Sequence, residues 1–261
     1  PMSSENEKPS QGERLQKILS RVGISSRRQA EQLITEGSVT INGKVAKIGD
    51  KAIFGKDAIK VNGKLIVHSP NRVYVAFYKP RAVLCAMSDP EGGCPALGAY
   101  LTRVEERVSP VGRMDFLSEG LLLLTNDGDL TEKITKSPDL PRVYHVKVKG
   151  HPNEEMLERI RKGAKLMEPE VKFLKPHSVR IIDDYTQKAL IEVVVLGNGA
   201  FDVKALFEAR GFLVEKITRD AIGQVSLRDM KPGDFRYLEL PQVQAMLEHP
   251  ELKVKELERE A

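Results

Sequence analysis

The sequence has little of what metal-binding, disulfide-bonded or membrane-embedded proteins contain. Its two cysteines, Cys85 and Cys94, make neither a disulfide framework nor a zinc knuckle. The five histidines show no ligand spacing with each other or with the cysteines. No apolar run approaches the roughly 18 to 20 residues that a membrane helix needs, and the N-terminus has neither a hydrophobic signal core nor an Arg-rich leader. We therefore expect no metal, no membrane segment and a cytoplasmic location.

Positive charge is unevenly distributed along the chain. The formal net charge is only +4, but residues 13–67 hold 11 Lys or Arg against 5 Asp or Glu. The remainder is therefore slightly acidic. A basic module attached to a near-neutral body favours a polyanionic partner, although a merely solvated basic surface would have the same charge.

The N-terminal part of the chain has the pattern of a small α/β domain. Residues 1–12 are polar and lack periodicity, so we expect them to be disordered. Apolar residues at helical spacing predict a helix from 15 to 22. Ser26 begins a second helix, with Gln29 placed for a capping box. Asn-Gly pairs at 42–43 and 62–63 lie between alternating apolar residues and predict two tight hairpins.

Two arginines begin the second helix, where the helix dipole disfavours cations. A phosphate bound at the helix start would interact favourably with Arg27 and Arg28 and with the free backbone N–H groups. Without such a ligand, they are two solvated side chains. The stretch from residue 13 to about 60 also resembles the small RNA-binding domain first seen in ribosomal protein S-four. That resemblance covers our proposed domain of residues 13–68. It implies an RNA-backbone surface formed by Arg14, Lys17, Arg27, Arg28 and Lys44.

Beyond a linker at residues 68–71, the pattern changes to many strands with occasional helices. Strands are predicted at 73–78, 143–149, 172–182, 188–196, 212–217 and 221–227. Helices are predicted at 130–136, 152–161 and shortly after residue 202. This mixture indicates an α+β body, built on a mixed, largely antiparallel sheet with flanking helices. We place this domain at residues 72–240, followed by a charged helical tail at 241–261.

Residues 112–128 are the most informative segment. A polar loop with one carboxylate, Asp115, is followed by a run of leucines and an Asn-Asp-Gly turn. Four leucines bounded by turn residues predict a strand buried on both faces. Asp115 just before it is anchored by the core yet accessible to a ligand, although an aspartate here would also suit a simple turn.

The same segment closely resembles the G-R-L-D-x-x-T-x-G-L-L-L-L-T-N-D-G signature of the RsuA/RluB family of ribosomal RNA pseudouridine synthases. The resemblance implies that Asp115 is the catalytic aspartate and that Tyr144 packs against the target uracil, whereas alternation with its neighbours also fits ordinary core packing. Lys204 falls where the family has a basic residue, usually arginine, that pairs with the aspartate. Lys79 and Arg113 are expected to contact RNA.

Five positions depart from the family pattern. Ser118 replaces the usual Thr, Met114 the usual Leu, and Ala82 the Gly that follows the Lys-Pro pair. Ala200 and Phe201 occupy positions that are usually basic or polar. Fewer charges there imply altered substrate contacts or reduced activity.

The resemblance implies an isomerisation of uridine in ribosomal RNA, most simply of the large subunit. Such a reaction has no redox change, and the Gly-Asn-Gly at 197–199 is not a nucleotide-binding fingerprint, so we expect no cofactor. The expected partner is ribosomal RNA or a ribosomal assembly intermediate. We expect the protein itself to be a monomer. Two alternatives stay open: a small-subunit enzyme, and a non-catalytic RNA-binding assembly factor that retains the fold.

Overall fold

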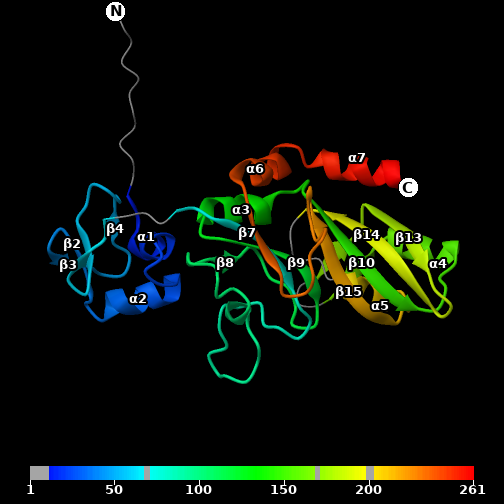
Figure 1. Cartoon of the computed structure of the whole chain (residues 1–261), viewed down its shortest axis with the longest axis horizontal. Coiled ribbons are helices and arrows are strands. Elements are labelled where there is room, and N and C mark those ends of the chain that lie inside the picture. Colours follow the sequence, from blue (N-terminus) through cyan, green and yellow to red (C-terminus); the bar gives the residue numbers. More distant parts are fainter. Residues whose placement is uncertain (1–11, 68–70, 168–170, 198–202) are drawn as a thin grey trace, which may run out of the picture. The chain divides into compact units, whose positions relative to one another are not determined.

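The structure is a computed structural model that describes residues 12–67, 71–167, 171–197 and 203–261. It divides into two compact units, Pro1–Arg72 and Val73–Ala261 (Figure 1). The expected disorder of residues 1–11 and most of the expected linker lie outside the described residues. Within the described ranges, no helix is long and apolar enough to cross a membrane.

The first unit is a small α/β domain. Its elements are β1 (Glu13–Arg14), α1 (Leu15–Arg21), α2 (Arg27–Thr35), β2 (Val39–Ile41), β3 (Lys44–Val45), β4 (Lys51–Ala52), β5 (Ile59–Val61) and β6 (Lys64–Leu65). Apolar side chains of α1, α2, β2, β4 and β5 form its core. The predicted capping box is confirmed, because the Ser26 side chain accepts from the Gln29 backbone and the Gln29 side chain accepts from the Ser26 backbone.

Both predicted hairpins are also confirmed. Asn42 and Gly43 join β2 to β3 with φ angles of 51° and 81°, and Asn62 and Gly63 join β5 to β6 with φ angles of 50° and 77°. Two consecutive positive φ angles match the twist of the flanking strands, and Asn-Gly adopts them at low cost.

The second unit is built on one large sheet. Its strands are β7 (Tyr74–Lys79), β8 (Ser109–Pro110), β9 (Glu119–Thr125), β10 (Pro141–Lys149), β11 (Ala164–Leu166), β12 (Lys172–Leu174), β13 (Ser178–Asp184), β14 (Lys188–Leu196), β15 (Val214–Ile222), β16 (Val225–Ser226) and β17 (Phe235–Leu238). Its helices are the short 3-10 turn Leu97–Ala99, α3 (Gly128–Lys136), α4 (Glu154–Arg161), α5 (Val203–Ala209), α6 (Leu240–Glu248) and α7 (Glu251–Glu260).

In the described residues, the main sheet has nine strands with the order β13-β14-β10-β15-β9-β7-β17; β16 pairs with β15 and β8 with β9. Neighbours run antiparallel except β9 and β15, which are parallel. The expected fold, a mixed and largely antiparallel sheet with flanking helices, is confirmed. The segment expected as a charged tail forms α6 and α7. Helix α6 contributes to the core and α7 packs on the sheet.

The leucine run explains why β9 lies in the middle of this sheet. Leu121 and Leu123 pack in the core beneath α3 and α6. Leu122 and Leu124 point to the opposite face and pack against the segment from Val83 to Val108. Every residue of β9 is buried, and each fully buried leucine contributes about 1.5–3 kcal/mol. The strand predicted to be buried on both faces is confirmed.

Strand β10 has two different faces. Tyr144, Val146 and Val148 face the core that α4 and α5 cover. Val143 belongs to the opposite face and packs against Leu257 of α7. The alternation of a strand therefore places His145 on that opposite face as well.

Two strand predictions were wrong in detail. The stretches 212–217 and 221–227 were expected as separate strands, but β15 runs from Val214 to Ile222 because its backbone pairs with β10 over that whole range. The buried Arg219 within it is accommodated by donating to the Leu121 carbonyl at 2.7 Å. The stretch 172–182 was expected as one strand, but it divides around Pro176 into β12 and β13, which pair with different strands. Proline has no N–H to donate to a ladder.

Candidate active site

The loop that carries Asp115 is fixed by a buried ammonium group. Lys79, the last residue of β7, is 0% exposed. Its Nζ donates to the carbonyl oxygens of Pro80 at 3.0 Å, Phe116 at 3.3 Å and Ser118 at 2.8 Å. Two of these carbonyls lie on the loop just after Asp115. The Ala82 backbone N–H also donates to the Phe116 carbonyl, at 2.8 Å, so the loop is tied to the end of β7 twice.

This burial contradicts the expectation that Lys79 contacts RNA. A side chain without exposed surface, with its ammonium group bonded to three carbonyls, holds the loop instead. Burial lowers the pKa of Lys79 to about 8, while Cys85 and Asp115 act in the opposite direction. Lys79 is therefore a cation close enough to Asp115 to interact with it electrostatically, and it positions the loop without facing solvent.

A glycine brings the two parallel strands close together at the start of β9. Glu119 and Gly120 pair with Thr218 and Arg219 of β15. A Cβ on Gly120 would lie 2.3 Å from the Arg219 carbonyl oxygen, so no other residue fits without moving the strands. This register leaves residues 214–217 of β15 beyond the start of β9, beside the Asp115 loop.

A cavity of about 400 Å³ lies at this place. Its lining residues are Arg81, Asp115, Phe116, Leu117, Ser118, Lys204, Val214, Glu215, Lys216 and Ile217. Asp115 is exposed, and Lys204 enters the same cavity from the first turn of α5. The structure thus brings together two of the three residues expected to be catalytic.

Lys204 has an ionic partner on its own helix. Its Nζ lies 3.7 Å from a carboxylate oxygen of Glu208, and both side chains are about half exposed. An exposed pair of this kind contributes only a few tenths of a kcal/mol. Lys204 can therefore exchange Glu208 for another anion in the cavity at little cost.

Two cations in the cavity were missed by sequence reasoning. Arg81 follows the Lys-Pro pair that ends β7, and Lys216 lies on β15 with its Nζ 2.8 Å from Glu119. The loop position of Arg81 beside a motif residue was an available signal. Lys216 gave none, because only the parallel pairing of β9 and β15 places it beside the loop.

The other predicted residues of this unit lie outside the cavity lining. Tyr144 is half-buried on β10, packed against the core that includes Val203 and Leu206 of α5. Arg113 is exposed on the loop before Asp115. The altered positions Ala200 and Phe201 lie outside the described residues.

The basic residues expected to meet RNA in the first unit are at its surface. Arg27 and Arg28 are exposed in the first turn of α2. Arg14 and Lys44 are also exposed. Lys17 is partly buried, with its Nζ 4.0 Å from Glu13. All five are available to a ligand.

Ala82, which stands where the family has glycine, has a backbone conformation that glycine would adopt more easily. Its φ angle is +59°, in the left-handed region that costs a residue with a Cβ about 1–2 kcal/mol. We expect Ala82→Gly to raise the free energy of unfolding by about 0.5–1 kcal/mol, less than the full strain because glycine gains entropy when unfolded. The melting temperature should rise by about 1–4 °C.

Thermal denaturation of the two proteins measures this effect. Ala209→Gly is the matched control, because Ala209 is exposed at the end of α5, and glycine should lower stability there. A melting temperature for Ala82→Gly at or below that of the parent would contradict the strain argument.

Comparison with known proteins covers both units. Residues 13–53 match the S4 domain family, and residues 73–194 match the RNA pseudouridylate synthase family. The chain is 35% identical to the ribosomal large subunit pseudouridine synthase B of Bacillus subtilis (strain 168), over 91% of this chain and 98% of that protein. It is 36% identical to an uncharacterized RNA pseudouridine synthase of Aquifex aeolicus (strain VF5), over 86% of this chain and 90% of that protein.

The fold has a solved counterpart as well. A crystal structure of a pseudouridylate synthase superposes with a TM-score of 0.60 at 26% identity, over 89% of this chain and 99% of that one. The two family matches together span residues 13–53 and 73–194, and the second range includes the Asp115 loop. The chain therefore belongs to the RsuA/RluB-type pseudouridine synthases, intramolecular isomerases that act on RNA, and its first unit is their S4 domain.

Proposed function

We propose that this enzyme converts one uridine of large-subunit ribosomal RNA to pseudouridine, with Asp115 as the catalytic carboxylate. The observation that carries the site is the shared cavity, whose lining combines the exposed carboxylate of Asp115 with Arg81, Lys204 and Lys216. The second carboxylate of the lining, Glu215, is paired with Lys188. The choice of large-subunit RNA is supported by the name of the Bacillus subtilis relative. A ribosomal substrate would place the protein in the cytoplasm.

The reaction breaks the bond from ribose to a uracil nitrogen and forms a bond from ribose to a uracil carbon. Asp115 would act at the sugar–base junction, and cations that line the cavity would keep its carboxylate ionised once RNA excludes water. Tyr144 would stack on the uracil from β10. Because extruding a base from a stack costs a few kcal/mol, a uridine in a loop is the easier target.

Lys204 gives a direct test of the electrostatic part of this proposal. Lys204→Ala should lower the single-turnover rate about ten- to hundredfold, because the carboxylate loses a cation near it. Lys204→Arg should keep most of the rate, since it restores the charge with the usual family residue. Equal rates for the parent and the alanine variant would remove Lys204 from the mechanism.

The arginines at the start of α2 are proposed to contact the RNA backbone without reading bases. Changing both Arg27 and Arg28 to Ala should weaken binding to all RNAs similarly and lower the slope of log affinity against log salt by about one or two units. Changing both to Lys is the control, because it preserves the charge. Loss of affinity for one sequence alone, or no loss, would argue against a backbone role.

Mapping pseudouridine in ribosomal RNA from a strain that lacks this protein tests the substrate. We expect one site to disappear from the large subunit. A site lost from the small subunit would instead support the small-subunit alternative. An unchanged map would overturn the proposal in favour of a non-catalytic assembly factor.

A further inference from the structure

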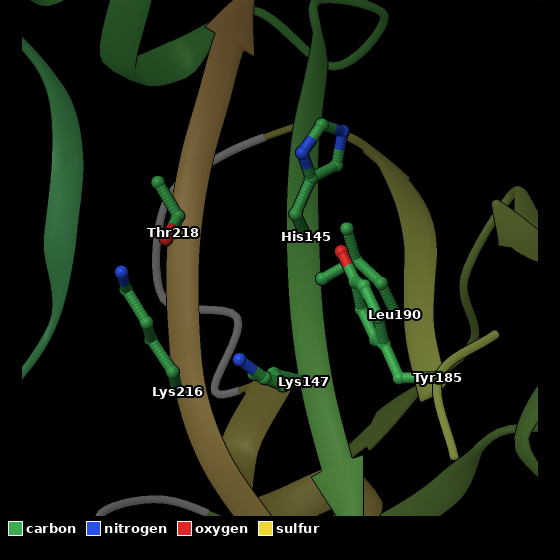
Figure 2. A pocket seen from close by; sticks show the side chains of 6 residues that line it. All are labelled: His145, Lys147, Tyr185, Leu190, Lys216 and Thr218. Carbon is green, nitrogen blue, oxygen red and sulfur yellow. The ribbon is translucent and has the colours of Figure 1, made fainter. Parts of the chain in front are cut away.

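A second cavity lies on the sheet face opposite to α4 and α5. It has a volume of about 220 Å³ and is lined by His145, Lys147, Tyr185, Leu190, Lys216 and Thr218 (Figure 2). These side chains come from β10, β14, β15 and the turn between β13 and β14. On β10, Val143 of this face is covered by Leu257 of α7, whereas His145 and Lys147 are only partly buried.

Four carboxylates lie near this cavity; Asp183 accepts from the Tyr185 hydroxyl, and the other three have cationic partners. Glu119 lies 2.8 Å from Lys216, and Glu215 lies 2.9 Å from Lys188. Glu192 lies 2.8 Å from Arg180 and 4.0 Å from His145.

Beyond these ion pairs, two lysines, Lys147 and Lys149, stand against the single carboxylate of Asp183, so positive charge is in excess beside the cavity. The ammonium group of Lys147 lies over the Tyr185 ring, 5.6 Å from its centre. Lys149, two residues further along β10, is exposed. The face therefore favours an anionic ligand.

Tyr185 offers an aromatic surface on a supported turn. Its side chain is 46% exposed, and its hydroxyl bonds to Asp183. His151 supports the turn from both sides, with Nδ1 2.5 Å from Asp184 and Nε2 2.8 Å from the Thr186 carbonyl. These two acceptors raise the pKa of His151, because only the doubly protonated ring donates to both.

An exposed aromatic ring beside lysines on an open sheet face fits single-stranded RNA. Bases stack on the ring, and ammonium groups meet the phosphates. Lys216 lines both this cavity and the Asp115 cavity, so the two cavities are neighbours that share a cation.

We propose that His145, Lys147, Tyr185 and Lys216 form a second RNA-binding surface, which holds single-stranded RNA flanking the target uridine. This inference rests on the proposed function and adds to it a binding surface that begins at Lys216 of the catalytic cavity and extends beyond that cavity. A duplex is disfavoured as the occupant, because its bases are stacked on each other and present no face to Tyr185.

The test compares four full-length variants in RNA binding: Tyr185→Ala, Tyr185→Phe, Lys147→Gln and the control Lys162→Gln. Lys162 is an exposed lysine at the end of α4, on the covered face of the sheet. The probe is a single-stranded ribosomal RNA fragment that extends on both sides of the target, with a duplex of the same length for comparison.

Tyr185→Ala should weaken binding to the single-stranded fragment about five- to hundredfold, and Tyr185→Phe should restore it. Lys147→Gln should lower the salt slope by about one unit, whereas Lys162→Gln should match the parent. The single-turnover rate at saturating RNA should stay unchanged in all four, because none of these residues is placed in the catalytic machinery.

If both Tyr185→Ala and Lys147→Gln bind RNA with the affinity and salt slope of the parent, the proposed second RNA-binding surface is wrong. An equal loss of affinity for the duplex would contradict the claim that this surface binds single-stranded RNA. Failure of the proposed function is seen separately, as a parent protein that binds the fragment but forms no pseudouridine in it.

Discussion

Replacing Asp115 with asparagine should abolish pseudouridine formation and leave RNA affinity unchanged or slightly higher. The amide keeps the size of the side chain but removes the negative charge and the nucleophilic oxygen. Affinity should not fall, because the variant repels phosphate less. Since Asp115 is exposed and its backbone carbonyl still accepts from Ser118 at 3.1 Å, the loop should keep its shape.

Single-turnover pseudouridine yield beside a binding assay measures this prediction. Thermal denaturation shows whether the variant folds as the parent does. Turnover by Asp115→Asn equal to that of the parent would exclude Asp115 from the mechanism and, with it, the assignment of the cavity as the active site.

Lys79→Met should cause the second large effect, on both stability and rate. Methionine has a similar shape but leaves the carbonyls of Pro80, Phe116 and Ser118 without the ammonium that bonds them. We expect the free energy of unfolding to fall by about 2–4 kcal/mol, since buried acceptors lose charge-assisted partners. The rate should also fall, because the Asp115 loop loses its anchor.

The pH profile separates this role from simple packing. Burial lowers the pKa of Lys79 to about 8, so the group is an ammonium below that pH and loses its proton as the pH rises through it. A neutral amine has two N–H groups for three carbonyls, and its lone pair then faces an oxygen. The parent rate should therefore fall above about pH 8, and Lys79→Met should lack this decline. A variant as stable and active as the parent would contradict the anchoring role.

The features that sequence reasoning predicted well are set by neighbours along the chain. The capping box of Ser26 with Gln29, and the Asn42-Gly43 hairpin, need only residues within one turn. The leucine run of β9 was equally clear, because a strand buried on both faces has no alternation.

The features that were missed depend on residues that are distant in sequence. Lys79 resembled a surface cation because two of the three carbonyls that bond its ammonium group come from residues about 40 positions further along. Arg219 and Asp220 resembled a break between strands for the same reason, since the partner of Arg219 is the Leu121 carbonyl. Lys216 joins the cavity only through the pairing of β15 with β9. Charged residues within strands were thus the common source of error.

Single-turnover reaction of the purified full-length protein with separate large-subunit and small-subunit ribosomal RNA tests the central claim most directly. We expect one pseudouridine at one position in the large-subunit RNA, formed without an added cofactor, and none in the small-subunit RNA. Unmodified large-subunit RNA, or modification of the small-subunit RNA instead, would contradict the proposed substrate.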